Sequence, residues 1–156
     1  RADAIASPLS WQASSVALDH AGEPVAVTRV DAAGRVGDGC IEWTSPAPRR
    51  EELPPALTSD WSLFEAVARL GASGAGPMDF AMLEDFELLR PRQQLRAAGW
   101  TDAEVAGRRL RLFGYRQTGW GILPRHYWLD EAGRLVLVTG GLRGFAAHEA
   151  ASGLGG

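Results

Sequence analysis

His126 is the residue whose type and neighbours best suit chemistry in this sequence. It stands between Arg125 and Tyr127, and Trp128 follows in the same run. An imidazole beside an indole and leucines has few competing hydrogen-bond partners, which suits a general base or the polar contact of a ligand pocket. A half-buried histidine satisfied by one hydrogen bond explains the same pattern. One residue type does not decide between these interpretations.

The aromatic residues around His126 extend this candidate site. The chain has six tryptophans, and aromatic faces with a few polar groups suit sugars or an apolar ligand. Trp120 lies between two glycines and is expected to be exposed. The competing interpretation places Trp11, Trp43, Trp61 and Trp128 in a core between a sheet and a helix. The candidate ligand-binding residues are Trp120, His126, Trp128, Leu135, Leu137, Tyr115 and Arg116.

Other kinds of catalytic or metal site are not indicated. The histidines are scattered, with His20 in a predicted turn and His148 in a tail rich in Gly and Ala, and His-Glu-x-x-His does not occur. Cys40 is the single cysteine, which excludes an intrachain disulfide and a four-thiolate zinc site. Gly-x-Ser-x-Gly is absent, and the glycine-rich segment 114–121 does not match a phosphate-binding loop. We therefore predict no metal and no cofactor.

Carboxylates occur in three clusters, which are Glu51-Glu52, Glu84-Asp85-Glu87 and Asp130-Glu131. A glycosidase needs two carboxylates facing each other across a cleft, and the sequence gives no such distance. Glu51 and Glu52 follow two arginines in a proline-rich segment and are expected to be solvated, and a turn explains Asp130. We predict that none of these clusters is catalytic.

Composition and charge are those of an ordinary globular protein. The 156 residues are 46% apolar and 22% charged, and a chain of this length buries one continuous core. We expect a single domain over residues 1–156, with flexible ends at 1–8 and 146–156. All sixteen basic residues are arginine, but the net charge is −3, so nucleic acid is not an expected partner. No apolar run is long enough to span a bilayer.

Three short segments that run from Asp to Gly predict tight turns, at residues 19–22, 31–34 and 130–133. In a four-residue hairpin loop, Asp accepts a backbone N–H at the start and Gly supplies the positive φ at the end. Near-alternating Val, Trp, Ile and Thr at 11–18, 25–30 and 35–43 predict strands. The N-terminal part is therefore expected to be an antiparallel meander.

One amphipathic helix is predicted at residues 58–70, after a proline-rich crossing loop at 45–57. Ser59 or Thr58 caps its first turn, its Leu, Phe and Val residues recur at helical spacing, and Gly71 follows where a C-cap belongs. The apolar stripe requires a partner surface, and we expect the sheet to provide it.

The middle of the chain is less regular. Residues 71–77 are expected to be flexible, and residues 78–89 suggest two strands separated by acidic residues, with a short helix as the competing prediction. The spacing of Thr101 and Glu104 matches a capping box, but an Ala-Gly pair stops any helix soon after. We expect a strand at 108–117.

The last predicted hairpin has residues 130–133 as its loop, which pairs Trp128 with Leu135 and His126 with Leu137. Alternation then places these four side chains on one face of the sheet. The other face carries Arg125, Tyr127, Leu129, Val136 and Val138. Both faces are substantially apolar, so the second face is either partly covered or turned to a ligand groove. Together these elements predict an α+β, mostly β fold with a curved antiparallel sheet packed on one main helix.

Two motifs flank the predicted helix, which are Leu53-Pro54-Pro55 before it and Tyr127-Trp128-Leu129-Asp130-Glu131-Ala132-Gly133-Arg134-Leu135 after it. With these motifs, the order of elements over residues 53–138 resembles the lipoprotein-carrier-like half-barrel proteins of bacteria and their periplasmic relatives. The resemblance implies an open half-barrel whose apolar concave face binds acyl chains or another hydrophobic ligand. The resemblance also implies an exported, periplasmic protein. If the resemblance does not hold, we expect a cytoplasmic protein. No catalytic residue carries over.

Three functions fit these observations, in this order. The first is a non-catalytic binding protein with an apolar and aromatic groove for a hydrophobic or acyl-bearing small molecule. The second is an interaction or structural subunit whose sheet is covered by a partner protein, including a second copy in a homo-oligomer. The third is a small carbohydrate-active enzyme with His126 or an acidic residue as general base, and with Tyr115 or Arg116 positioning the substrate.

Overall fold

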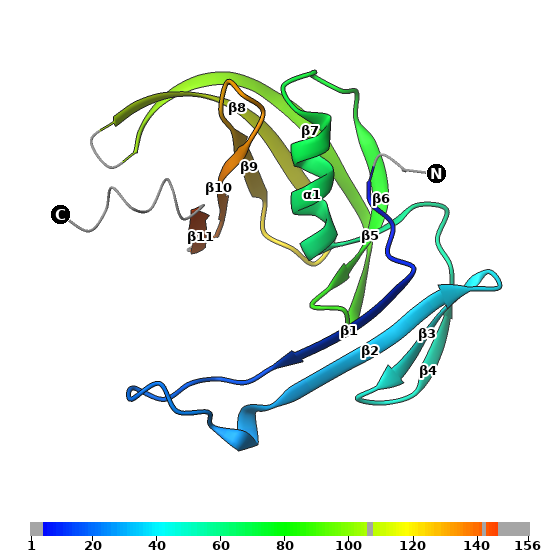
Figure 1. The fold of residues 1–156 in the computed structure, drawn as a ribbon. Coiled ribbons are helices and arrows are strands. Elements are labelled where there is room, and N and C mark those ends of the chain that lie inside the picture. Colours follow the sequence, from blue (N-terminus) through cyan, green and yellow to red (C-terminus); the bar gives the residue numbers. More distant parts are fainter. Residues whose placement is uncertain (1–4, 106–107, 142, 147–156) are drawn as a thin grey trace.

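The computed structural model describes residues 5–105, 108–141 and 143–146. These residues form two sheets and one α-helix, which is the mostly β architecture with one main helix that the sequence predicts. The larger sheet curls into a half-barrel around the helix, and the smaller sheet extends beside it (Figure 1). No helix in the described part of the chain is long and apolar enough to cross a membrane.

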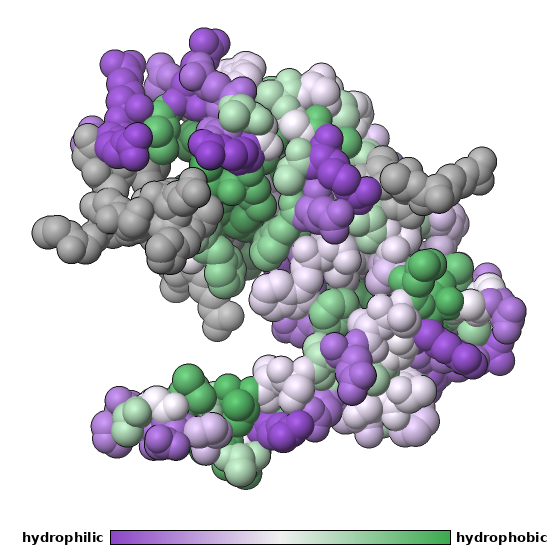
Figure 2. Space-filling model, viewed as in Figure 1, coloured by the Kyte–Doolittle hydropathy of each residue, from purple (hydrophilic) through white to green (hydrophobic). Residues whose placement is uncertain are grey.

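The smaller sheet consists of four N-terminal strands in chain order. They are β1 (Ser10–Ser15), β2 (Val30–Gly37), β3 (Cys40–Ser45) and β4 (Arg49–Glu52), and each neighbouring pair is antiparallel. β4 lies inside the segment 45–57 that was expected to be a crossing loop. The predicted strand at 25–30 was also wrong, because Ala26–Thr28 form a short 3-10 helix, η1, between β1 and β2. Figure 2 shows the arm formed by β1, β2 and their connection standing away from the rest of the molecule.

Two of the three predicted Asp-to-Gly turns form. Asp19 Oδ1 accepts two backbone N–H groups at 2.8 and 2.9 Å, and Gly22 has a φ of 84°. Asp130 Oδ1 accepts the Arg134 N–H at 2.8 Å, and Gly133 has a φ of 76°. In both turns the aspartate accepts hydrogen bonds from backbone N–H groups of the loop, and the glycine allows the positive φ.

The prediction of a turn at 31–34 was wrong. That segment lies within β2, and the chain reverses instead at Asp38 and Gly39, whose φ angles are 50° and 72°. Two successive positive φ angles between directly paired strand ends define a type I′ hairpin turn, and Asp-Gly is among the strongest sequence signals for it. The single strand expected at 35–43 is therefore the end of β2, this turn and most of β3.

The larger sheet has the order β11-β10-β9-β8-β7-β6-β5. Its strands are β5 (Leu57–Ser59), β6 (Met78–Glu84), β7 (Leu88–Val105), β8 (Arg108–Gly119), β9 (Arg125–Leu129), β10 (Leu135–Gly140) and β11 (Arg143–Ala146). β5 and β6 are parallel, and the other neighbouring pairs are antiparallel. The two strands expected within 78–89 correspond to β6 and the start of β7, and the strand expected at 108–117 is β8.

β7 is an 18-residue strand that the sequence does not reveal. Thr101 and Glu104, which have capping-box spacing, lie within it and pair with β8. The register shifts between Ala97 and Gly99, and Gly99 has a φ of 89°. A bulge with glycine at positive φ bends a strand and increases its twist, and it lets β7 and β8 arch over the helix (Figure 1).

The helix α1 (Asp60–Leu70) has the predicted caps and end, but it begins after the predicted start at residue 58, because Thr58 and Ser59 belong to β5. Ser59 is the N-cap and its Oγ accepts the Ser62 N–H at 2.9 Å, while Gly71 follows the last turn with a φ of 57°. Its apolar stripe packs on the concave face of the larger sheet, as expected. The fully buried residues at this contact include Leu63, Ala66, Val67, Met82, Leu95, Tyr115, Tyr127 and Leu129.

A second core joins the two sheets through β6. Phe80 and Met82 of this strand face the helix, whereas the alternate residues Ala81 and Leu83 pack on the smaller sheet. A strand buried on both faces shows little polar alternation, which explains the weak pattern at 78–84. The expected burial of Trp11 and Trp43 is confirmed in this second core, but Trp61 is 55% exposed and the expectation for it was wrong.

The two ends of the chain were expected to be flexible. Ile5 lies within the segment 1–8, yet it is only 8% exposed and its carbonyl accepts the Thr58 hydroxyl. Residues 147–156, which include His148, lie outside the described residues.

Candidate functional site

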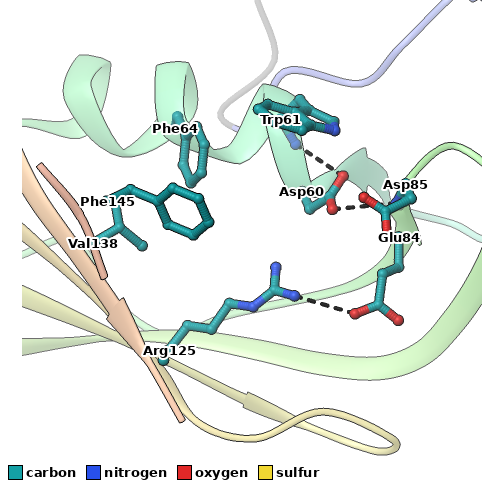
Figure 3. Close-up of a pocket in the computed structure, with 9 residues that line it drawn as sticks. Asp60, Trp61, Phe64, Glu84, Asp85, Arg125, Val138 and Phe145 are labelled. Atoms are coloured by element: carbon teal, nitrogen blue, oxygen red, sulfur yellow. Dashed lines mark hydrogen bonds and ion pairs between the residues drawn. The ribbon is translucent and has the colours of Figure 1, made fainter. Parts of the chain in front are cut away.

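A cavity of about 220 Å³ opens at one end of the half-barrel, and we call it the mouth cavity. It lies between the start of α1, the end of β6 and strands β9 to β11 (Figure 3). Phe64, Val138 and Phe145 form an aromatic and aliphatic wall on one side (Figure 3). Asp60, Glu84 and Asp85 form a charged wall on the other side, where Trp61 lies beside Asp60, and Arg125 reaches across to Glu84. The cavity is therefore amphiphilic.

The charged wall is organised by Glu84. Arg125 Nη2 lies 3.1 Å from Glu84 Oε1, and Arg90 Nε lies 2.8 Å from Glu84 Oε2. The Arg125 and Glu84 side chains are 27% and 21% exposed, so water screens this pair less than a surface pair. Arg125 begins β9 and Glu84 ends β6, and two strands separate them in the sheet order. Their ion pair thus spans the mouth of the half-barrel and joins two strands that are not neighbours in the sheet.

Asp60 lies at the inner end of the same wall and is 8% exposed. Its Oδ1 accepts the Trp61 N–H at 3.0 Å, and its Oδ2 accepts the Asp85 N–H at 3.2 Å. Burial raises the pKa of Asp60 above its ordinary value, against the opposing effect of the hydrogen bond from the Asp85 backbone. The carboxylate thus fixes the start of α1 to the end of β6, and its charge is incompletely compensated.

A buried chain of polar side chains lies near the mouth cavity and crosses β9, β8 and β7. The Tyr127 hydroxyl donates to Gln117 Oε1 at 2.7 Å, Gln117 Nε2 donates to Gln93 Oε1 at 3.3 Å, and Gln93 Nε2 donates to the Trp120 carbonyl at 3.0 Å. Burial raises the pKa of Tyr127 well above its usual range, so this hydroxyl stays protonated. A satisfied buried network of this kind holds the strands in one register.

The aromatic side chains around the mouth cavity run from solvent into the core. Trp61 meets Phe64 edge to face at 5.9 Å between ring centroids, and Phe64 meets Tyr127 in the same way at 6.0 Å. Phe145 on the other side of the mouth is 58% exposed. Trp61 and Phe145 therefore form an exposed aromatic rim, which is a surface suited to an apolar ligand.

The structure separates the candidate residues that the sequence groups together. Tyr127 and Leu129 contact the helix-side core, so His126 and Trp128 point to the outer face of the sheet, away from α1. Their rings stack at 5.7 Å with an angle of 15°. Arg116 is exposed and pairs with His126 across β8 and β9, so it shares the outer face.

The predicted register of the last hairpin was wrong. Leu137 pairs with Trp128, Thr139 pairs with His126, and the register shifts between Leu135 and Leu137. Such a shift places an extra residue in one strand. Side chains after the extra residue therefore point to the opposite face from the one that regular pairing predicts. Leu137 therefore stays with Trp128 on the outer face, but Leu135 pairs with Leu129 and packs against the core.

Two other candidates lie apart from this group. Tyr115 is 1% exposed and its hydroxyl donates to the Gly71 carbonyl at 2.9 Å, which ties β8 to the end of α1. Trp120 is 74% exposed, as expected, after the end of β8. The sequence thus grouped residues from the outer face, the core and a turn, and ligand binding by them stays a prediction.

The residues of the mouth cavity were not selected from the sequence. Glu84 and Asp85 fall in an acidic cluster that was predicted to have no catalytic role, and Asp60 falls within the predicted helix range 58–70. The available signal was the position of Glu84 and Asp85 at the end of a buried strand. Within the described ranges, no group of His, Cys, Asp and Glu could hold a metal ion.

The fold and the cavity define a β half-barrel that is filled by one helix and has an amphiphilic mouth. No protein-family model matches the sequence, and no curated protein matches it. A crystal structure of a beta-barrel-like protein of the domain of unknown function DUF1849 from Brucella abortus has a similar fold, with a TM-score of 0.53 and 11% sequence identity. The likeness covers 90% of this chain and 67% of that chain. At this low sequence identity, the likeness is evidence for a similar fold alone.

Proposed function

We propose that this protein is a non-catalytic binding protein that holds a hydrophobic or acyl-bearing ligand at the mouth cavity. The observation that carries the proposal is that two exposed aromatic side chains, Trp61 and Phe145, line the same cavity as a group of charged side chains. An apolar body can lie on the rings while a polar end meets the charges. The resemblance to lipoprotein-carrier-like half-barrels supports a ligand with an acyl chain.

The mouth is a better candidate for the ligand than the concave face itself. That face is occupied by α1, whose Leu63, Ala66 and Val67 are fully buried against it. Protein cores are packed at crystal-like density, so a ligand there would have to displace the helix. The mouth cavity requires no such rearrangement.

The charges favour a ligand whose polar end is an amine or a neutral amide over a carboxylate. Three carboxylates, from Asp60, Glu84 and Asp85, line the cavity together with a single guanidinium, from Arg125. Arg125 is already paired with Glu84. An added carboxylate would therefore face an excess of like charge, which costs binding free energy.

The test is calorimetric titration of dodecylamine, below its micelle concentration, into the protein and two variants. We expect Trp61→Ala to weaken binding about fivefold, since one cation–aromatic or apolar aromatic contact contributes about 1 kcal/mol. Trp120→Ala is the matched control, because Trp120 is also exposed but does not line the cavity. Weakening by Trp120→Ala with no effect of Trp61→Ala would overturn the proposal and favour a site near the turn after β8.

An interaction subunit is the alternative function that a specific observation favours. Leu18, Val27 and Val30 on the β1–β2 arm are 60%, 92% and 45% exposed. Exposed apolar side chains close to each other mark protein interfaces. Sedimentation velocity at high protein concentration checks for self-association through this arm, and a sole monomer peak argues against the homo-oligomeric form of this alternative.

A further inference from the structure

We propose that the ligand site continues past the mouth cavity into a second subsite, which takes the apolar tail of an elongated amine or amide. This inference rests on the proposed function and specifies its ligand. The second subsite is a hollow of about 720 Å³ between the β1–β2 arm and the turn that joins β6 to β7. Figure 2 shows the arm and the body of the molecule separated at this level.

The two spaces meet at Trp61 and Asp85, which line both of them. Trp61 is 55% exposed, so its ring forms a surface over which a chain can pass from one space to the other. Asp85 makes no hydrogen bond or ion pair through its carboxylate within the described part of the chain, and it is exposed at this junction. A polar group of the ligand can bind there without displacing a protein partner.

The floor of the hollow is built from small side chains on one face of the arm. Ala13 pairs with Ala32, and Ser15 pairs with Val30, so these side chains share a face with Trp11. At Trp11 this face is covered by the stacked ring of Phe86, 6.1 Å away. Beyond Trp11 the face opens gradually, since Ala32 is 4% exposed and Ala13 is partly buried, whereas Ser15 and Val30 are exposed. The hollow therefore continues an apolar surface that is packed at one end and open at the other.

The opposite side of the hollow indicates the chemistry of the ligand. Phe86 supplies an apolar contact and Glu87 a carboxylate whose Oε1 is buried and has no hydrogen-bond partner. A buried acceptor without a partner costs free energy that an N–H donor recovers. No arginine lines this hollow in the described ranges. Both features favour an amine or amide over a carboxylate.

The sizes of the two spaces explain why both are needed. Pockets for small organic ligands are about 300–1,000 Å³, whereas the mouth cavity alone has about 220 Å³. The mouth cavity therefore accommodates a polar end with a short chain, and a longer chain must extend over Trp61 into the hollow.

The experiment measures the affinity of a series of linear alkylamines, from hexylamine to tetradecylamine, by calorimetric titration below their micelle concentrations. Each additional methylene that becomes buried strengthens binding about fourfold, so affinity is expected to rise through the whole series. Ala13→Phe fills the hollow and should leave hexylamine binding unchanged while weakening tetradecylamine binding at least about tenfold. Ser15→Phe, on the same face, serves as a second filling variant if Ala13→Phe does not fold.

Gln12→Phe is the matched control, because this neighbouring residue of β1 points to the opposite face of the arm. It should leave the dependence on chain length intact. If hexylamine and tetradecylamine bind the unmodified protein equally, or if the filling variants retain the full dependence on chain length, the second subsite is overturned while the mouth site stands. If no alkylamine binds at all, the proposed function and this inference both fail.

Discussion

Arg125 Nη2 lies 3.1 Å from Glu84 Oε1, and this ion pair joins β9 to β6 across the mouth of the half-barrel. The two residues are 41 positions apart in the chain and are separated by β8 and β7 in the sheet. The pair therefore exists only because the sheet curls, and it in turn stabilises the curled form. Its position places the same two side chains in the wall of the mouth cavity.

Loss of this pair should destabilise the protein more than loss of a surface pair. Arg125→Gln removes one of the two cations paired with the partly buried Glu84 carboxylate, and we expect a loss of about 1–3 kcal/mol in the free energy of unfolding. The control is Arg109→Gln, whose partner is Asp102 at 3.4 Å and whose side chain is 83% exposed. We expect a change within about 0.5 kcal/mol for this variant. Equal losses in urea unfolding would argue that the Arg125 pair does not hold the half-barrel closed.

Gly34 should be much less tolerant of substitution than Gly37, although both lie in β2. A Cβ at Gly34 would lie 2.3 Å from Trp11 Cζ2 and 2.6 Å from the Glu42 carbonyl oxygen, whereas a Cβ at Gly37 would meet nothing within 4 Å. Gly34→Ala therefore forces the ring and backbone of the second core apart, at a cost of about 1–3 kcal/mol or more. Gly37→Ala should be nearly neutral. Thermal unfolding of both variants checks this, and similar midpoints would contradict the described packing of Trp11.

The buried Asp60 should make stability fall with rising pH in the mildly acidic range. Its pKa is raised in the folded protein, so the folded state binds more protons than the unfolded state between the ordinary aspartate value, about 3.9, and the folded pKa. The free energy of unfolding therefore decreases as pH rises through this window. Above the window, Asp60 causes no further change with pH. Asp60→Asn removes the contribution. Urea unfolding from pH 4 to pH 7 should show a smaller decline for the variant, and an identical decline would mean that another group is responsible.

Features of the fold that depend on neighbouring residues could be predicted from the sequence. Ser59 and Gly71 mark the ends of α1 because capping acts within one turn, and the Asp130 turn forms because its hydrogen bonds are local. Asp38-Gly39 carries an equally local signal, but the turn was predicted at 31–34 and a strand was predicted across residues 38 and 39. The error moved one hairpin by several residues without changing the fold class.

Features that depend on irregular strands or on curvature could not be predicted. The bulge at Gly99 allows one long bent strand where the sequence contains glycine and proline, and these residues usually interrupt a strand. The irregularity before Leu137 moved Leu135 from the predicted groove to the core. The mouth cavity forms where Arg125 and Glu84 meet, and no local pattern encodes that contact.

The most direct test of ligand binding at the mouth is a crystal structure of the protein grown with dodecylamine. We expect electron density for the amine beside Asp60 and Asp85, with the alkyl chain lying over the ring of Trp61. Density for the chain on the outer face, against the stacked rings of His126 and Trp128, would contradict it and return the binding site to the residues that the sequence suggests.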